Sequence, residues 1–138
     1  MDRVSSDTLE TIRVRIDAVG SLHRPVLKLP SDAFSPGYIR ISTHTETFHA
    51  NIETQFSGDL EISGLYENPR LARQKEGTNH LPDWLTEYEL APGRSVLLDI
   101  ITPGKHYGMR PPGERAVYQT VDEPADSLQS IAEKYASE

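Results

Sequence analysis

The sequence predicts one mostly-β domain, a closed or nearly closed β-barrel or pseudobarrel with two short helices. Seven or eight short segments are either apolar or alternate apolar with polar residues at a period of two. Turn signals built from Pro, Gly and Asp separate these segments at close spacing, which is typical of barrels. The 138 residues amount to a single domain, residues 1–138, and can bury a core without cross-links.

The strands follow from this alternation. Ile12, Val14 and Ile16 alternate with charged residues, so one face of the first strand is expected to be wet. The run at 95–101 is the most apolar and predicts the most buried strand. The other expected strands cover residues 26–29, 38–42, 47–54, 60–64, 107–109 and 115–121.

One helix is predicted after a polar segment. Asn79 is a suitable N-cap, and Pro82 falls in the first turn, where an N–H is not needed. Trp84, Leu85 and Tyr88 then lie on one side of the helix. This pattern predicts that the helix packs its apolar side on the barrel.

The two ends of the chain are polar. We expect residues 1–9 to be flexible. Asp126 and Gln129 have the spacing of a capping box, which predicts an acidic C-terminal helix within residues 122–138. We expect this helix to cover apolar barrel surface, so that its deletion would lower stability.

Composition removes several classes of function. The chain has no cysteine, which excludes disulfides, thiolate catalysis and cysteine zinc sites. The N-terminus does not resemble a signal peptide, and no apolar run reaches membrane length. We therefore expect a cytoplasmic protein with no membrane partner.

No catalytic motif stands out. The chain lacks a nucleophile elbow, a dinucleotide-binding glycine pattern and a P-loop. His44 and His49 lie across a predicted turn and strand, and side chains on opposite strand faces do not easily share a metal. Asp83, Asp99 and Lys105 are loose candidates for nuclease chemistry, but they lack the tight acid–x–Lys spacing. The sequence favours a non-enzymatic protein with no metal and no cofactor.

The net charge of −7 opposes binding to polyanions, but its distribution weakens this objection. Residues 120–138 carry five carboxylates against one lysine. Residues 67–115 carry seven acids and seven bases. The surplus of acid therefore lies outside the segment that contains the candidate binding residues.

Two basic regions form the candidate binding site. Arg70 and Arg73 lie three apart, on one side of a helical turn. Arginine suits bidentate contacts to phosphate or guanine, and an aromatic ring can stack on a base. The two regions would form two arms, one before and one after the strand at 95–101. The predicted nucleic-acid-binding residues are Arg70, Arg73, Lys75, Lys105, Tyr107, Arg110 and Arg115.

The sequence leaves three classes of function open. The first is a nucleic-acid-binding or regulatory module, with double-stranded DNA of modified or defined sequence as the leading partner. The second is a protein-interaction or adaptor domain that uses the same loops, with Tyr66 and Trp84 nearby. The third is a small hydrolase or nuclease with an unrecognised motif. Arg110 and Arg115 could equally have a structural role instead of a binding role, because they flank a Pro-Pro-Gly turn and can pair with nearby acids.

Several short motifs carry a resemblance to known proteins. They are Arg24-Pro25, Leu29-Pro30, and residues 68–73, 93–96 and 107–115. Taken together, they make nearly the whole chain similar to a family of short, uncharacterised haloarchaeal proteins. This resemblance implies a cytoplasmic, salt-adapted protein and supplies no activity.

The order of motifs along the chain also resembles the B3-like DNA-binding pseudobarrel. In order, the motifs are Leu29-Pro30, Phe48-His49-Ala50, Asn68-Pro69, Trp84-Leu85 and Gly93-Arg94-Ser95-Val96. That class includes plant transcription-factor domains and restriction-enzyme recognition domains, which grip the DNA major groove with two loop or strand arms. The resemblance implies a barrel that binds double-stranded DNA through loops.

Overall fold

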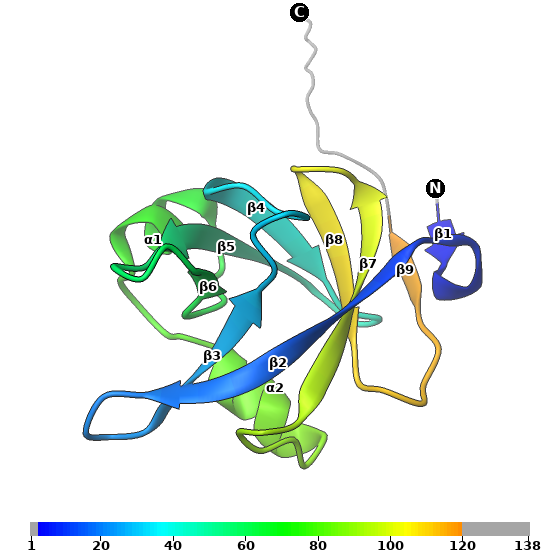
Figure 1. The fold of residues 1–138 in the computed structure, drawn as a ribbon. Helices are drawn as coiled ribbons and strands as arrows, with labels where there is room; N and C mark the ends of the chain where they lie inside the picture. The colour runs from blue at the N-terminus through cyan, green and yellow to red at the C-terminus, as the bar shows by residue number, and fades with distance from the viewer. Residues whose placement is uncertain (1–2, 120–138) are drawn as a thin grey trace, which may run out of the picture.

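The computed structural model describes residues 3–119, in which seven strands form a closed barrel (Figure 1). The barrel strands are β2 (Thr11–Val19), β3 (Arg24–Leu29), β4 (Gly37–Ser42), β5 (Thr47–Thr54), β6 (Leu60–Ile62), β7 (Ser95–Thr102) and β8 (His106–Arg110). Around the barrel they follow the order β2, β3, β6, β5, β4, β8, β7. With two short helices outside the sheet, this architecture confirms the predicted mostly-β barrel.

One strand pair breaks the antiparallel pattern. β4 and β8 run parallel and pair only through residues 40–42 and 106–108. The other barrel pairs are antiparallel. Because β8 begins at His106, residues 37–39 of β4 lie beyond its start, next to the turn that joins β7 to β8.

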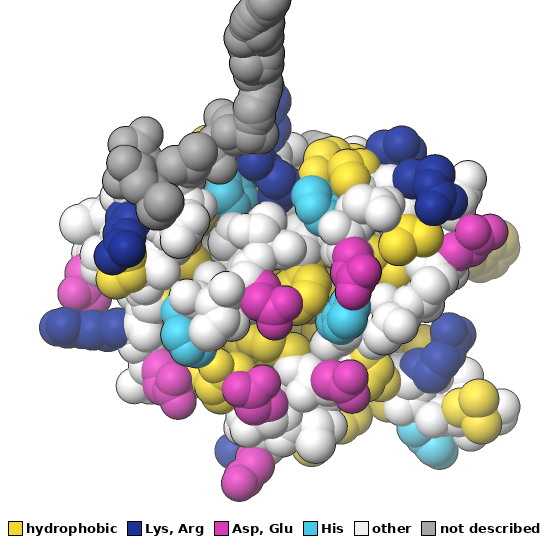
Figure 2. Space-filling view, turned by 180° about the vertical axis from the view of Figure 1, so that it is seen from behind, with side chains coloured by type: hydrophobic (Ala, Val, Ile, Leu, Met, Phe, Trp, Pro, Cys, Tyr) yellow, Lys and Arg dark blue, Asp and Glu magenta, His cyan; other side chains and the backbone are white. Residues whose placement is uncertain are grey.

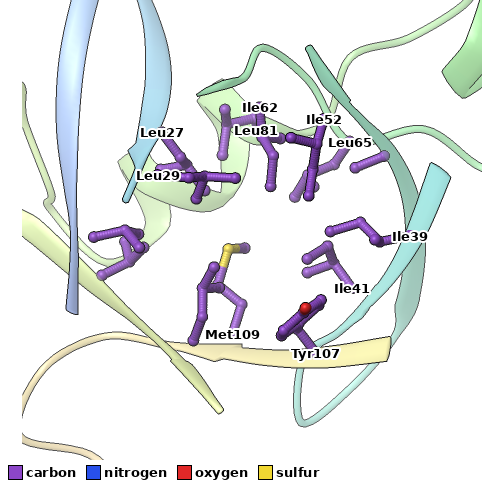
Figure 3. Close-up of a cluster of buried hydrophobic side chains, with 14 of the residues drawn as sticks. Leu27, Leu29, Ile39, Ile41, Ile52, Ile62, Leu65, Leu81, Tyr107 and Met109 are labelled. Atoms are coloured by element: carbon purple, nitrogen blue, oxygen red, sulfur yellow. The ribbon is translucent and has the colours of Figure 1, made fainter. Parts of the chain in front are cut away.

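Alternate apolar residues fill the interior of the barrel (Figure 3). In β5, Phe48, Ala50 and Ile52 are buried, whereas the residues between them are more exposed. In β8, Tyr107 and Met109 point into the same interior, as Figure 3 shows. The apolar residues that alternate along the separate strands thus pack together in one shared core.

The predicted central strand, β7, buries its two faces unequally. Val96 and Leu98 are fully buried in the core, while Leu97 and Ile101 on the other face are half-buried. Asp99 shares that outer face and is nevertheless fully buried. Something other than the barrel interior must therefore cover this carboxylate.

A two-stranded ribbon provides that cover. β1 (Arg3–Ser5) pairs antiparallel with β9 (Val117–Gln119), and the 3-10 turn η1 (Ser6–Thr8) follows β1. The Tyr118 ring is fully buried where a Cβ on Gly108 would overlap it, so the ribbon lies on the outer face of β8. Within the segment expected to be flexible, residues 3–5 pair with β9.

Helix α1 (Pro69–Gln74) is built from local signals. The Asn68 side chain accepts a hydrogen bond from the Leu71 N–H at 2.9 Å, and Pro69 occupies the first turn. Lys75 ends the helix in the left-handed conformation, with φ of 56°. The helix packs against β5 and β4.

Helix α2 (Leu81–Glu87) is the predicted tryptophan-bearing helix. An N-cap at Asn79 would start the helix at residue 80, and it starts one residue later. His80 occupies the N-cap position and makes no side-chain cap bond. The Asn79 side chain instead accepts from the N–H groups of Leu81 and Leu65, both at 3.0 Å. The buried side chains of α2, which belong to the barrel core, are Leu81, Trp84 and Leu85.

The remaining boundaries differ little from those expected. β6 ends at Ile62, two residues early, and β9 begins at Val117, two residues after the start of the predicted strand at 115–121. The predicted helix within residues 122–138 lies outside the described residues. Neither helix found in residues 3–119 has the length and apolar character needed to cross a membrane.

Candidate functional site

A groove opens beside the start of β4, where the β7–β8 turn approaches it. Its volume is about 650 Å³. Its described lining residues are Tyr38, Arg40, His49, Gly104 and Lys105. Two of these residues are cations, two carry aromatic rings, and none is a carboxylate. We call this hollow the β4 groove.

Strand register brings these side chains together. Arg40 of β4 lies directly opposite His49 of β5. Because Ile39 is in the core, Tyr38 and Arg40 project from the outer face. The Arg40 N–H donates to the Lys105 carbonyl at 2.8 Å, which holds the β7–β8 turn against β4.

Tyr38 and His49 form a fixed pair of rings. The Tyr38 hydroxyl oxygen lies 2.6 Å from His49 Nδ1, and the ring planes are 13° apart with centroids at 5.8 Å. Burial lowers the pKa of His49, and the nearby Arg40 lowers it further. The imidazole is therefore neutral near pH 7, which allows Nδ1 to accept the Tyr38 hydroxyl.

Three other hollows in the described surface contain carboxylates. The hollow beside the ribbon, of about 510 Å³, includes Asp7 and Glu114. A third, of about 340 Å³, includes Glu53 and Glu61, and a fourth, of about 190 Å³, includes Glu46. Since carboxylates repel phosphate, the β4 groove is the best suited of the four to an anionic ligand.

The first predicted arm lies on α1. Arg70 and Arg73 are exposed, and the Arg70 Nη1 donates to Gln74 Oε1 at 3.0 Å. Lys75 is compensated, because its Nζ lies 2.9 Å from Glu53 Oε2. α1 packs against β5 and β4, the strands that also carry Tyr38, Arg40 and His49, but no residue of α1 is among the described residues that line the β4 groove.

The second predicted arm is divided by the fold, and Tyr107 shows this most clearly. Its side chain is 2% exposed, with the ring centroid 5.1 Å from that of Phe34. Its hydroxyl accepts a hydrogen bond from the Gly104 N–H at 2.8 Å. Tyr107 is therefore a core residue, whereas its near neighbour Lys105 lines the β4 groove.

Arg110 is held by a buried carboxylate. Its Nε donates to Asp99 Oδ2 at 2.8 Å and its Nη2 to Asp99 Oδ1 at 3.2 Å. The third nitrogen, Nη1, donates to the Glu114 carbonyl at 2.6 Å. Asp99 also accepts from the hydroxyls of Tyr118, at 2.6 Å, and Thr11. We call Asp99, Arg110, Tyr118 and Thr11 the Asp99 cluster.

The electrostatics of the Asp99 cluster fit a structural role. The Asp99 hydrogen bond raises the pKa of Arg110, so the guanidinium stays charged. Burial, and then Asp99, raises the pKa of Tyr118, so the phenol remains a donor. The cluster joins β2, β7, β8 and β9, and every nitrogen of the Arg110 guanidinium is engaged within the protein.

Arg115 lies in a third place. Its side chain is 80% exposed, and its Nε lies 3.4 Å from Asp7 Oδ1. It lines the ribbon hollow together with Asp7 and Glu114. The seven predicted residues thus occupy α1, the β4 groove, the core, the Asp99 cluster and the ribbon, and they do not form one surface.

Sequence reasoning missed Tyr38, Arg40 and His49 as site residues. The alternation in residues 38–42 does indicate that Tyr38 and Arg40 share a face opposite Ile39. Nothing local indicates that His49 lies across from Arg40, because this depends on the register of β4 and β5.

A buried serine–histidine pair bears on the hydrolase alternative. The Ser42 Oγ lies 2.7 Å from His106 Nε2, but the two residues are 1% and 3% exposed. Both side chains are closed to solvent in this structure. Asp99 is engaged with Arg110, and no three His, Asp or Glu side chains in residues 3–119 gather around a possible metal position.

The adaptor alternative uses the same basic loops, with two aromatic residues nearby. Tyr66 is 6% exposed and Trp84 is 7% exposed, with the Trp84 ring 4.7 Å from that of Tyr88. Neither ring is presented to a partner. The exposed large apolar side chains of the described chain are Leu22, Phe56 and Val117.

Charge on the back of the molecule is mixed. Figure 2 shows acidic and histidine side chains interspersed over this face, with Lys and Arg side chains toward its periphery. The described residues of this face thus form no continuous basic patch. On this face, binding to a polyanion would have to rely on a local site.

The comparisons with known proteins give a family and no activity. No curated protein and no solved structure matches the chain. The haloarchaeal and B3-like resemblances are not shown by these comparisons. Over residues 1–135 the sequence matches a family of unknown function, DUF7112, and the chain belongs to that family.

Proposed function

We propose that this protein is a nucleic-acid-binding module and that its binding site is the β4 groove. One observation carries the proposal. The β4 groove is larger than the three other hollows described, and it combines Arg40, Lys105 and two rings with no described carboxylate. Cations that bind phosphate beside rings that contact bases are the common elements of nucleic-acid sites.

The proposal keeps part of the site predicted from the sequence. Lys105 remains a phosphate contact, and Arg40 joins it from the facing strand. Arg70 and Arg73 are exposed on α1, which packs against β5 and β4, and they would extend the path of a nucleic-acid backbone. Tyr107 and Arg110 are left out, because the core and the Asp99 cluster engage them.

Salt-dependent binding tests the proposal. Fluorescence anisotropy would compare single-stranded and duplex DNA and RNA at several salt concentrations. Each phosphate contact contributes about one unit to the slope of log K against log salt. We expect Lys105→Gln to weaken binding and to reduce this slope by about one unit.

Arg13→Gln is the matched control. Arg13 is an exposed cation on β2, which is three strands away from both β4 and β5 around the barrel. This variant removes the same charge and should retain wild-type binding. Absence of binding to every nucleic acid tested, or equal losses for Lys105→Gln and Arg13→Gln, would exclude the β4 groove as the site.

A further inference from the structure

We infer that the β4 groove takes single-stranded nucleic acid in preference to duplex, with an unpaired base against the Tyr38–His49 rings. This inference rests on the proposed function and specifies its ligand. The starting observation is that the two rings are nearly parallel, 13° apart, and fixed by a 2.6 Å contact between the hydroxyl oxygen and Nδ1. Both residues are half-buried, so part of each ring faces the groove.

A fixed ring is a platform for a base only if the face of the base is accessible. In a duplex both faces of a base are covered by its neighbours, whereas in a single strand they are exposed. A flexible aromatic side chain would lose conformational freedom on stacking. Here the Tyr38 hydroxyl is already held by His49, so less ordering is required when a base arrives.

The shape of the site points the same way. Duplex base edges are read by a helix or a β-ribbon that enters the major groove, which is about 12 Å wide. The β4 groove is a hollow of about 650 Å³, within the range of about 300–1,000 Å³ typical of small-ligand sites. A hollow of this size can receive a flipped or unpaired nucleotide. It offers no projecting element that could enter the groove of a duplex.

The cations lie where the phosphates of such a nucleotide would run. Arg40 is the register partner of His49, so it stands beside the rings on the outer face of the sheet. Lys105 approaches from the β7–β8 turn, whose backbone is bonded to Arg40 at 2.8 Å. A strand crossing the groove therefore meets the rings with one cation on β4 and another on the turn.

The experiment compares oligo(dT) and oligo(U) of about 12 nucleotides with a DNA duplex of the same length, by anisotropy at fixed salt. We expect either single strand to bind at least about tenfold more tightly than the duplex. Oligo(dT) and oligo(U) distinguish a DNA ligand from an RNA ligand, because oligo(U) carries the 2′-hydroxyl and lacks the thymine methyl group. Thermal unfolding of each variant would verify that it is folded.

Two Tyr38 variants isolate the stacking contact. Tyr38→Leu should weaken single-strand binding by about 5- to 150-fold, the loss expected when one stacking partner is removed. Its salt slope should stay at the wild-type value, because no phosphate contact is lost. Tyr38→Phe retains the ring and should lose much less affinity, which makes it the matched control.

The failure of this inference is distinct from the failure of the proposed function. Duplex binding equal to or tighter than single-strand binding would overturn it, as would a Tyr38→Leu variant that binds oligo(dT) like wild type. In either case a continued effect of Lys105→Gln would leave the β4 groove as a nucleic-acid site. No binding to any of the three probes would overturn both.

Discussion

Lys105 and Arg110 lie at the two ends of β8, and their surroundings differ completely. Lys105 is exposed in the turn before the strand and lines the β4 groove. Arg110 is 14% exposed by side chain and is bonded to the buried carboxylate of Asp99. In the sequence both are bases in loops rich in Gly and Pro, and both are predicted to bind nucleic acid.

What separates them is the residue that the adjacent strand places opposite. β7 pairs with β8 so that Asp99 faces Gly108, one outward position before Arg110. A buried carboxylate needs a charged or hydrogen-bonding partner, and Arg110 supplies two donors. No described carboxylate lines the hollow beside Lys105, where we propose that this side chain binds a ligand. Two bases five residues apart thus differ, one held by the protein and the other proposed to bind, and only their neighbours distinguish them.

The largest expected effect comes from a substitution that breaks the Asp99 cluster. Asp99→Asn should lower the free energy of unfolding by about 3–5 kcal/mol, because it leaves the partly buried Arg110 charge without its partner. Urea unfolding measures this change. Asp17→Asn, which removes an exposed carboxylate paired with Arg15, should leave the midpoint nearly unchanged.

The same measurement sharpens the comparison between the two bases. Lys105→Gln should leave the free energy of unfolding at the wild-type value while it weakens binding. Arg110→Gln should lower the free energy of unfolding, since the buried Asp99 carboxylate would then have a weaker partner. If Arg110→Gln is as stable as wild type, the structural role of the Asp99 cluster is wrong.

A smaller effect concerns the ribbon that covers this cluster. Gly108→Ala should cost about 1–3 kcal/mol, because the new methyl group would overlap the ring of Tyr118. In a Tyr118→Ala background the same substitution should cost much less, and a double-mutant cycle by urea unfolding measures the difference. Additive costs would show that Tyr118 does not occupy this space. The affinity of the β4 groove for nucleic acid should be unaffected.

The smallest expected effect is the pH dependence of stability due to His49. Its pKa in the folded protein is below the ordinary value of 6.5, so the unfolded chain binds this proton first as the pH falls. The His49 contribution to stability is therefore complete above about pH 6.5 and decreases as the pH falls below it. Unfolding free energies at about pH 8 and about pH 5.5 should differ less in His49→Gln than in wild type. His44→Gln, in the exposed β4–β5 turn, controls for the loss of an imidazole, and an equal reduction in both variants would contradict the prediction.

Local pattern accounts for most of the barrel. The strand predicted at 47–54 has the bounds of β5, because Phe48, Ala50 and Ile52 alternate with polar residues that no other constraint overrides. β6 is shorter than predicted because the Asn79 side chain occupies the backbone groups that follow it: it donates to the Ser63 carbonyl and accepts from the Leu65 N–H, both at 3.0 Å. That contact joins residues far apart in the sequence, so no local pattern indicates it.

The site follows the same division. The sequence by itself determined which residues face outward: in β8 the alternation that buries Tyr107 and Met109 also turns Gly108 and Arg110 to the outside. It also determined the shared core and, through the lack of cysteine, the kinds of chemistry that are excluded. All of these depend on the period of a strand, which is a property of neighbouring residues.

Only the tertiary structure decided which outward residues meet. The register of β4 with β5 sets Arg40 beside His49, and the short parallel pairing of β4 with β8 brings the Lys105 turn to the same place. β9 returns over β8 and places the Tyr118 hydroxyl on Asp99, and the same carboxylate accepts a hydrogen bond from Arg110. Register and crossover depend on packing between distant segments, and a strand pattern of period two is compatible with several partners. For this reason the barrel could be predicted from the sequence, whereas it could not be predicted which bases are held within the protein and which line the β4 groove.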